Sequence, residues 1–305
     1  MSEPLNITVM LGGPSAEREV SLRSGAAVAQ ALRTLGHNVH ELDPVARNWV
    51  LPAGTDVVVL TLHGTYGEDG TVQRQLEALG VPYTGCDAVA SRIAFDKLLT
   101  KQRFAAAGVP APRFTVLTAA STAWPEGWQP PVVLKPLRQG SSVGLQLVQR
   151  KAEWKAALAD ALRYDSEVLM EDRIVGRETT VGILADEALP VVEVRPKAGA
   201  YDYRNKYTPG NTEYFCPAPF PPDITQRIQA AGLAAFRAVG GRDFGRVDIM
   251  VTEGGDPWVL EVNTLPGMTA TSLLPKAAAA AGLGFAGLCQ RMVDLARQRA
   301  LVPAP

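Results

Sequence analysis

Oxygen-bearing side chains occur at regular spacing near the carboxyl end of the chain. Residues 246–263 contain two runs that alternate apolar and polar residues around a turn rich in glycine and ending in proline, which predicts a β-hairpin. Because successive side chains of a strand point to opposite faces, Glu261 and Asn263 share one face, and a suitable register places Asp248 beside them. Two carboxylates and an amide oxygen favour Mg²⁺, particularly when phosphates complete the ligand set. A polar strand face turned to water is the simpler alternative.

A second candidate site is the glycine- and serine-containing loop at residues 137–142. It lies between two predicted strands, residues 132–136 and 143–148, and Lys135 belongs to the first of them. Such a loop can surround phosphate groups with its backbone N–H groups while the lysine supplies a positive charge. An exposed strand lysine is an equally simple interpretation of Lys135.

The same loop fits a serine-hydrolase pattern, G-x-S-x-G, at residues 140–144, with Ser142 as the nucleophile. Two observations oppose this alternative. The residues after Ser142 alternate like a strand instead of opening a helix, and the histidines of the chain, His37, His40 and His63, all precede the serine. The hydrolase therefore stays a distant alternative.

The amino-terminal part predicts the elements that would position a ligand. Residues 7–11 form an apolar run, followed by a glycine turn at residues 12–17 and a helical pattern. The start of such a helix leaves backbone N–H groups that can bind an anion. Residues 56–62 predict another buried strand, after which His63 opens a loop. Because ligands bind at the carboxyl ends of parallel strands, both loops are expected to face one cleft of a small doubly wound α/β domain.

Strands dominate the pattern after a helix at residues 96–107, which predicts an α+β layer rather than a second doubly wound unit. Residues 196–217 predict a long polar and aromatic loop, a length typical of lids. A helix at residues 223–239 precedes the hairpin, and residues 272–301 are expected to form closing helices.

Composition excludes several classes of protein. The 305 residues, 47% of them hydrophobic, can supply substantial cores, and 30 basic against 31 acidic residues leave no excess for binding nucleic acid. No apolar run reaches the ~20 residues that span a bilayer, and no basic leader precedes the first strand, so a cytoplasmic protein without membrane partners is expected. The three separated cysteines, Cys86, Cys216 and Cys289, are expected to be reduced and structural.

The order of these motifs resembles the D-alanine:D-alanine ligase family of the ATP-grasp fold over nearly the whole chain. The supporting stretches are residues 11–22, 62–70, 81–85, 96–98, 135–136 with 140–144, 201–203 with 206–207, and 261–269. The resemblance implies three domains: a Rossmann-like substrate domain at residues 1–94, a central subdomain with the phosphate loop at 95–184, and a carboxyl-terminal subdomain with lid and metal site at 185–305. It also implies ATP, two Mg²⁺ with Mn²⁺ as a substitute, and a homodimer.

The resemblance assigns roles by matching motif positions. The residues implied to contact the nucleotide are Lys97, Lys135, Gly140, Ser142 and Lys206 on the phosphate side, and Glu171 and Glu178 on the adenine and ribose side. The residues implied to hold the metal ions are Asp248, Glu261 and Asn263. The residues implied to bind or act on the amino-acid substrates are Glu17, His63, Ser141, Tyr207, Arg246, Gly267, Ser272 and Leu273.

The implied reaction phosphorylates the carboxylate of one D-alanine, and the amine of a second D-alanine then attacks the acyl phosphate. Arg246 and the N–H of Gly267 would stabilise the tetrahedral intermediate, where a fixed donor contributes ~3 kcal/mol to lowering the barrier. Tyr207 favours D-alanine as the acceptor over D-lactate or D-serine, which remain the alternatives within this fold. A nucleotide-binding protein without activity is a further alternative, and the intact Arg246 opposes it.

Overall fold

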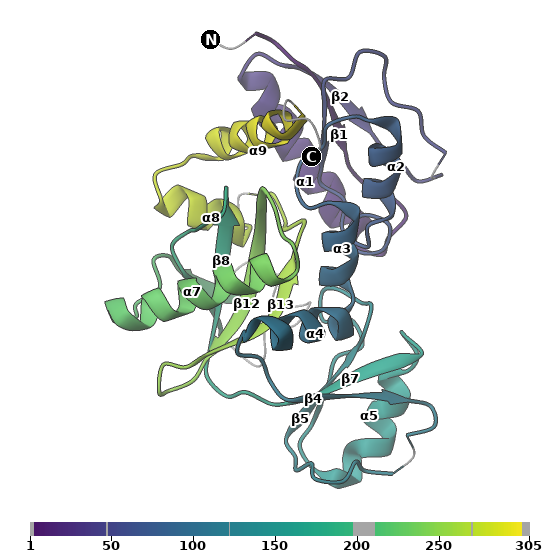
Figure 1. Cartoon of the computed structure of the whole chain (residues 1–305), viewed down its shortest axis with the longest axis vertical. Coiled ribbons are helices and arrows are strands. Elements are labelled where there is room, and N and C mark those ends of the chain that lie inside the picture. Colours follow the sequence, from purple (N-terminus) through teal and green to yellow (C-terminus); the bar gives the residue numbers. More distant parts are fainter. Residues whose placement is uncertain (1–2, 47, 122, 198–210, 270, 301–305) are drawn as a thin grey trace.

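The computed structural model describes residues 3–46, 48–121, 123–197, 211–269 and 271–300 (Figure 1). Within these residues the chain forms three sheets that follow one another in sequence. A parallel sheet comes first, and two antiparallel sheets follow. None of the helices in the described ranges is long and apolar enough to cross a membrane.

The first sheet has the strand order β2-β1-β3, with both pairs parallel as the apolar patterns predict. All four residues of β3 are buried, as expected for a strand covered on both faces. The helix α3 has no counterpart among the predicted elements, because its eight mostly small residues lack a clear amphipathic period. The elements are β1 (Asn6–Met10), α1 (Arg18–Thr34), β2 (Asn38–Leu42), β3 (Val57–Leu60), α2 (Thr71–Leu79) and α3 (Ala88–Phe95).

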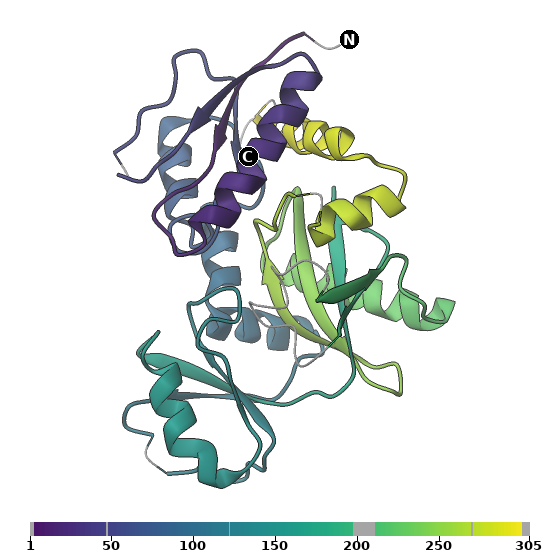
Figure 2. The ribbon, with the colours of Figure 1, turned by 180° about the vertical axis from the view of Figure 1, so that it is seen from behind.

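The second sheet has the order β4-β7-β5-β6 and lies at one end of the molecule with α5 against it (Figures 1 and 2). Trp154 and Leu158 of α5 are buried in its core with Val132 and Met170 of the sheet. The helix α4 begins after Asp96, whose carboxylate accepts from two backbone N–H groups of its first turn. The elements are α4 (Lys97–Ala107), β4 (Phe114–Thr118), β5 (Val132–Pro136), β6 (Gln146–Val148), η1 (Lys151–Glu153), α5 (Trp154–Ala161) and β7 (Glu167–Asp172).

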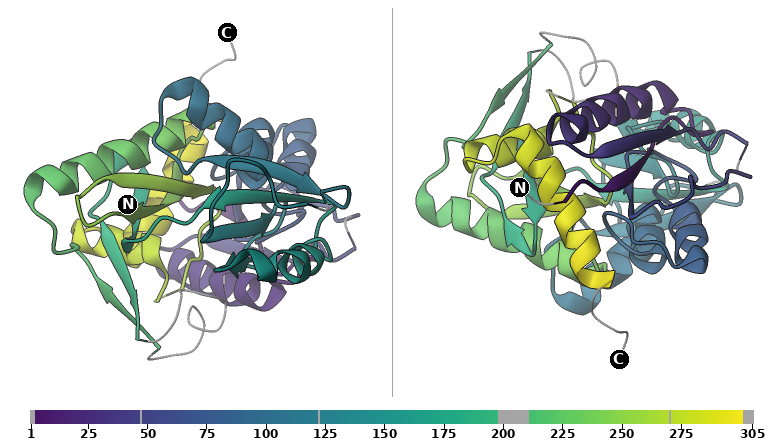
Figure 3. Two further views of the ribbon diagram at one scale, coloured as in Figure 1. Left: turned by 90° about the horizontal axis from the view of Figure 1, so that it is seen from below. Right: turned by 90° about the horizontal axis from the view of Figure 1, so that it is seen from above.

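The third sheet has the order β11-β10-β8-β12-β13 and lies between α7 and α8 (Figure 3). A Cβ at Gly232 of α7 would lie 2.9 Å from Val181, whereas a Cβ at the next strand residue, Gly182, would lie 2.9 Å from Leu274 of α8. Successive residues of β8 therefore face opposite helices. The elements are β8 (Arg177–Leu184), β9 (Glu187–Ala188), β10 (Val192–Pro196), β11 (Thr212–Phe215), α7 (Pro222–Ala238), β12 (Phe244–Val251), β13 (Pro257–Asn263), α8 (Leu273–Ala280) and α9 (Phe285–Ala300).

One feature of this sheet differs from the sequence-based expectations. Residues 212–215 were expected to be loop, but they form β11, because Tyr214 and Phe215 pair with the distant strand β10. The strand β8 hydrogen-bonds to β10 and β12, although the predicted boundary after residue 184 groups it with the central part of the chain. The division into three domains stays a prediction.

Candidate functional site

The hairpin of β12 and β13 places the predicted metal ligands on one face. Asp248 lies opposite Glu261, and Arg246 lies opposite Asn263. Directly opposed residues of an antiparallel pair share a face, and residues two apart on one strand do as well. All four side chains therefore project to the same side of the sheet, in the register that the hairpin pattern required.

Arg246 and Asp248 also contact each other. The Arg246 Nε and Nη2 groups donate to the two Asp248 oxygens at 2.7 and 2.9 Å, and both side chains are largely buried. In the described part of the chain, no three His, Cys, Asp or Glu side chains gather as metal ligands. The predicted set contains two carboxylates, from Asp248 and Glu261, with Asn263 as its third donor.

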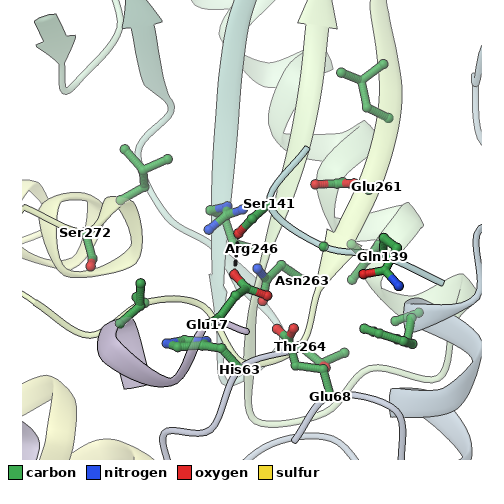
Figure 4. Close-up of a pocket in the computed structure, with 18 of the residues that line it drawn as sticks. Glu17, His63, Glu68, Gln139, Ser141, Arg246, Glu261, Asn263, Thr264 and Ser272 are labelled. Atoms are coloured by element: carbon green, nitrogen blue, oxygen red, sulfur yellow. Dashed lines mark hydrogen bonds between the residues drawn. The ribbon is translucent and has the colours of Figure 1, made fainter. Parts of the chain in front are cut away.

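A pocket of about 530 Å³ lies beside the hairpin of β12 and β13 (Figure 4). Residues from the amino-terminal, central and carboxyl-terminal parts of the chain line it. The pocket is lined by residues of the loops after β1 and β3, the hairpin and the start of α8. It is also lined by the glycine- and serine-containing loop at residues 137–142, called the serine loop below. The predicted site residues among them are Glu17, His63, Lys97, Gly140, Ser141, Arg246, Glu261, Asn263, Gly267, Ser272 and Leu273.

Glu17 is held between two loops that are far apart in the sequence. The Ser141 hydroxyl donates to Glu17 Oε1 (Figure 4). A Cβ at Gly64 or at Gly140 would lie 3.0 or 3.1 Å from Glu17 Oε2, so glycine allows both loops to approach the carboxylate. The predicted contact between Glu17 and Ser141 is present in the structure.

The serine loop has an unusual backbone. Ser141 and Ser142 both adopt positive φ, 51° and 60°, a conformation that costs free energy for residues other than glycine. Successive backbone N–H groups in such conformations form concave anion-binding sites. Lys97 attaches the loop to α4, because its backbone N–H donates to Leu137 O at 3.2 Å and its Nζ to Gln139 O at 2.5 Å.

The residues predicted on the nucleotide side form a buried charged cluster. Lys135 Nζ lies 2.5 Å from Glu171 Oε2, and Lys101, which sequence analysis did not select, contacts Glu171 Oε1. Burial opposes ionisation of Glu171, but the two ammonium groups outweigh it and hold its pKa below the usual value. Glu178 on β8 is half-buried and lies opposite Met250 of the hairpin.

Two further predicted groups occupy other parts of the site. Ser272 precedes α8, and its hydroxyl accepts from the backbone N–H of Thr269 at 3.0 Å. A Cβ at Gly267 would lie 2.9 Å from that hydroxyl, so Gly267 and Ser272 are close together. Lys206 and Tyr207 lie outside the described residues.

Comparison with known proteins identifies the family. The family profiles described as "D-ala D-ala ligase C-terminus" and "D-ala D-ala ligase N-terminus" match residues 104–294 and 43–86. A D-alanine–D-alanine ligase from Methylacidiphilum infernorum is 46% identical over 296 residues and covers 97% of both chains. This chain belongs to the D-alanine–D-alanine ligase family.

Other members of the family agree in sequence and in fold. The ligase from Geobacter sulfurreducens is 45% identical and covers 94% of this chain and 92% of its own. A crystal structure of the Bacillus anthracis ligase matches with a TM-score of 0.85 at 34% identity, covering 97% of this chain and 98% of that one. The same ligase complexed with ATP matches with a TM-score of 0.83 at 33% identity, covering 98% and 99%. The predicted ATP-grasp fold class is therefore confirmed.

Glu68 lines the pocket, although sequence analysis did not select it. It is buried, and its Oε2 accepts from the backbone N–H of Gly64 at 2.8 Å. Burial, aided by the nearby Glu17 carboxylate, raises the pKa of Glu68 to about 8. The sequence signal that could have identified Glu68 is its position in the loop after a buried parallel strand, where ligands bind.

The raised pKa of Glu68 predicts a pH dependence of stability. A carboxyl group with a folded pKa of about 8 and an ordinary value of 4.5 binds its proton more tightly in the folded state. Its contribution to the free energy of unfolding is complete below pH 4.5 and is lost as the pH rises to about 8, in total about 5 kcal/mol. Urea unfolding of the wild type and of Glu68→Gln at several pH values measures this loss. The free energy of unfolding should decline less for the variant than for the wild type as the pH rises from 4.5 to about 8. Equal declines would contradict the assignment.

His63 predicts the opposite dependence. Burial, with Arg246 nearby, lowers its pKa from 6.5 to about 4, so the folded state favours the neutral ring. The contribution of the neutral His63 ring to the free energy of unfolding is complete above pH 6.5. It is lost as the pH falls toward 4, in total about 3 kcal/mol. The difference in unfolding free energy between wild type and His63→Gln should therefore shrink between pH 7 and pH 4.5. A constant difference would show that folding does not lower the pKa of His63.

Proposed function

We propose that this chain joins two D-alanine molecules to D-alanyl-D-alanine, a peptidoglycan precursor, with conversion of ATP to ADP and phosphate. The convergence of Glu17, Arg246, Glu261 and Asn263 on one pocket carries the proposal. A carboxylate that can hold an ammonium group and an arginine that can hold an oxyanion face the same space as Glu261 and Asn263.

In the first step, a carboxylate oxygen of one D-alanine attacks the γ-phosphorus of ATP, the bond to the bridging oxygen breaks and ADP leaves. Glu17, fixed by Ser141, holds the ammonium group of this substrate. His63 lies in the same pocket, and as a neutral ring it does not repel that ammonium group. Lys97, Lys135 and the serine loop hold the phosphates, and the proposal keeps Lys206, outside the described residues, as a further phosphate contact.

In the second step, the amine of another D-alanine, having lost a proton, attacks the carbonyl carbon of the acyl phosphate. Arg246 and the Gly267 N–H stabilise the resulting oxyanion, and phosphate leaves as the carbonyl re-forms. Ser272 and the backbone of Leu273 receive the carboxylate of the second substrate at the start of α8, where the helix end favours an anion. The proposal also keeps Tyr207, outside the described residues, as a partner of Glu17 and Ser141.

The donor set fits Mg²⁺. Glu261 and Asn263 supply hard oxygen atoms to the pocket, and Asp248 lies opposite Glu261 with its charge shared by Arg246. Two Mg²⁺, or Mn²⁺ in their place, would be held by these three residues and would neutralise the phosphate charge. We also propose that the protein forms a homodimer.

Two alternatives are less well supported. Ser142 lies in a turn that leads into the strand β6, not a helix, which does not fit a hydrolase nucleophile. A ligase that uses D-lactate or D-serine as the acceptor shares the pocket, but the relatives compared above are named as D-alanine–D-alanine ligases.

Phosphate release from Mg²⁺-ATP with D-alanine or L-alanine tests the proposal. We expect release that requires D-alanine and one dipeptide for each phosphate. Adding D-lactate or D-serine as competing acceptors and analysing the products tests the choice of second substrate. Equal release with L-alanine, or release without any amino acid, would contradict the proposed function.

A further inference from the structure

Three charged side chains from three elements, α4, β5 and β7, meet in one buried cluster. Glu171 on β7 is 1% exposed and uses one oxygen toward Lys101 of α4 and the other toward Lys135 of β5. Other charged residues around the cluster are Lys97, Asp165, Glu178 and Glu261.

The two lysines are not equivalent. Lys135 is 13% exposed and lies on the strand that leads into the serine loop, so its ammonium group can turn toward phosphates held there. Lys101 is 2% exposed and has only the interior around it. Lys101 therefore stays with Glu171 whatever Lys135 binds.

This difference matters when a nucleotide arrives. If Lys135 turns to the phosphates, Glu171 loses the cation on Oε2 and depends on Lys101 alone. A buried carboxylate without a cation is strongly disfavoured and takes up a proton instead. A protonated carboxyl group donates a hydrogen bond, whereas the 6-amino group of adenine needs an acceptor.

We propose that Lys101 is a positioning residue that keeps Glu171 an oriented acceptor for the 6-amino group of adenine while Lys135 binds the phosphates. This inference rests on the proposed function and on the family resemblance, which implies that Glu171 lies on the adenine and ribose side of the nucleotide. Lys101 itself does not touch the nucleotide. It makes the enzyme select 6-amino over 6-oxo purine nucleotides through Glu171.

The test compares ATP with inosine triphosphate, which carries an oxygen in place of the 6-amino group. In Lys101→Met the ratio of kcat/KM for ATP over inosine triphosphate should fall at least ~10-fold, because the acceptor state of Glu171 is lost. Lys101→Arg keeps a buried cation, so its ratio should stay within about threefold of the wild-type ratio. The KM for D-alanine should not change, because Glu17 and Ser141 are untouched.

Each outcome decides the inference. Equal losses with both nucleotides, or no change with either, would show that Lys101 only supports packing and would overturn it. If Lys101→Met does not fold, the double variant Lys101→Met with Glu171→Met, which removes the buried anion, replaces it: its ratio should match that of Glu171→Met alone. Methionine offers no oxygen to the 6-amino group, so a Glu171→Met ratio equal to the wild type would instead refute the adenine role of Glu171, and an inactive wild type would refute the proposed function.

Discussion

Glu261→Gln should lower kcat by at least ~100-fold while leaving the fold intact, because the amide keeps the shape of the side chain but loses the charge that binds Mg²⁺. Glu261 is half-buried, lines the pocket and lies opposite Asp248. A loss of this size corresponds to about 3 kcal/mol in the barrier. Steady-state kinetics across Mg²⁺ concentrations, with thermal unfolding in parallel, measures both effects.

The matched control is Glu253→Gln, which makes the same change at an exposed position in the turn of the same hairpin. Its activity and stability should equal those of the wild type. A near-normal rate for Glu261→Gln at limiting Mg²⁺ would remove Glu261 from the metal site. A loss of activity that follows unfolding would show a structural role instead.

Arg246→Met should lower kcat by ~10²–10³-fold, the typical result of removing one oxyanion donor. It should also destabilise the fold, because Asp248 is 8% exposed and loses two hydrogen bonds at 2.7 and 2.9 Å. Arg246→Lys keeps the charge but cannot donate in the same paired geometry, so it should recover stability more than rate. Urea unfolding and kcat on the same samples separate the two effects.

Arg237→Met supplies the comparison for this variant. Arg237 donates to both oxygens of Asp186 at 2.8 and 2.6 Å, as Arg246 does to Asp248, but both partners are more than half exposed. Removing such a surface pair should cost at most ~1 kcal/mol and no activity. If Arg246→Met kept full activity, the tetrahedral intermediate would have to be stabilised elsewhere.

The predicted hairpin illustrates what local patterns determine. Alternation along residues 246–263 predicts two strands and a turn, and the side-chain period places Glu261 and Asn263 on one face. The same period puts Arg246 and Asp248 on one face, but residue types alone do not show that the two side chains bond to each other.

Burial and distant pairing explain what the sequence could not show. Glu68 and Lys101 look like ordinary polar residues of a loop and a helix, and only the packing of remote elements around them makes their charges unusual. The sequence does not predict β11 for a related reason. This strand is stabilised by pairing with β10, and residues 197–211 separate the two strands in the chain. The glycine and serine loop was recognisable because its residue types restrict its backbone.

Transfer of oxygen from substrate to phosphate tests the central claim most directly. When D-alanine carries the heavy oxygen isotope in both carboxylate positions, attack on the γ-phosphorus carries one labelled oxygen into each phosphate released, which mass spectrometry detects. The account predicts one heavy oxygen per phosphate together with dipeptide that keeps one label from its first residue. Unlabelled phosphate released alongside dipeptide would contradict an acyl phosphate intermediate in this pocket.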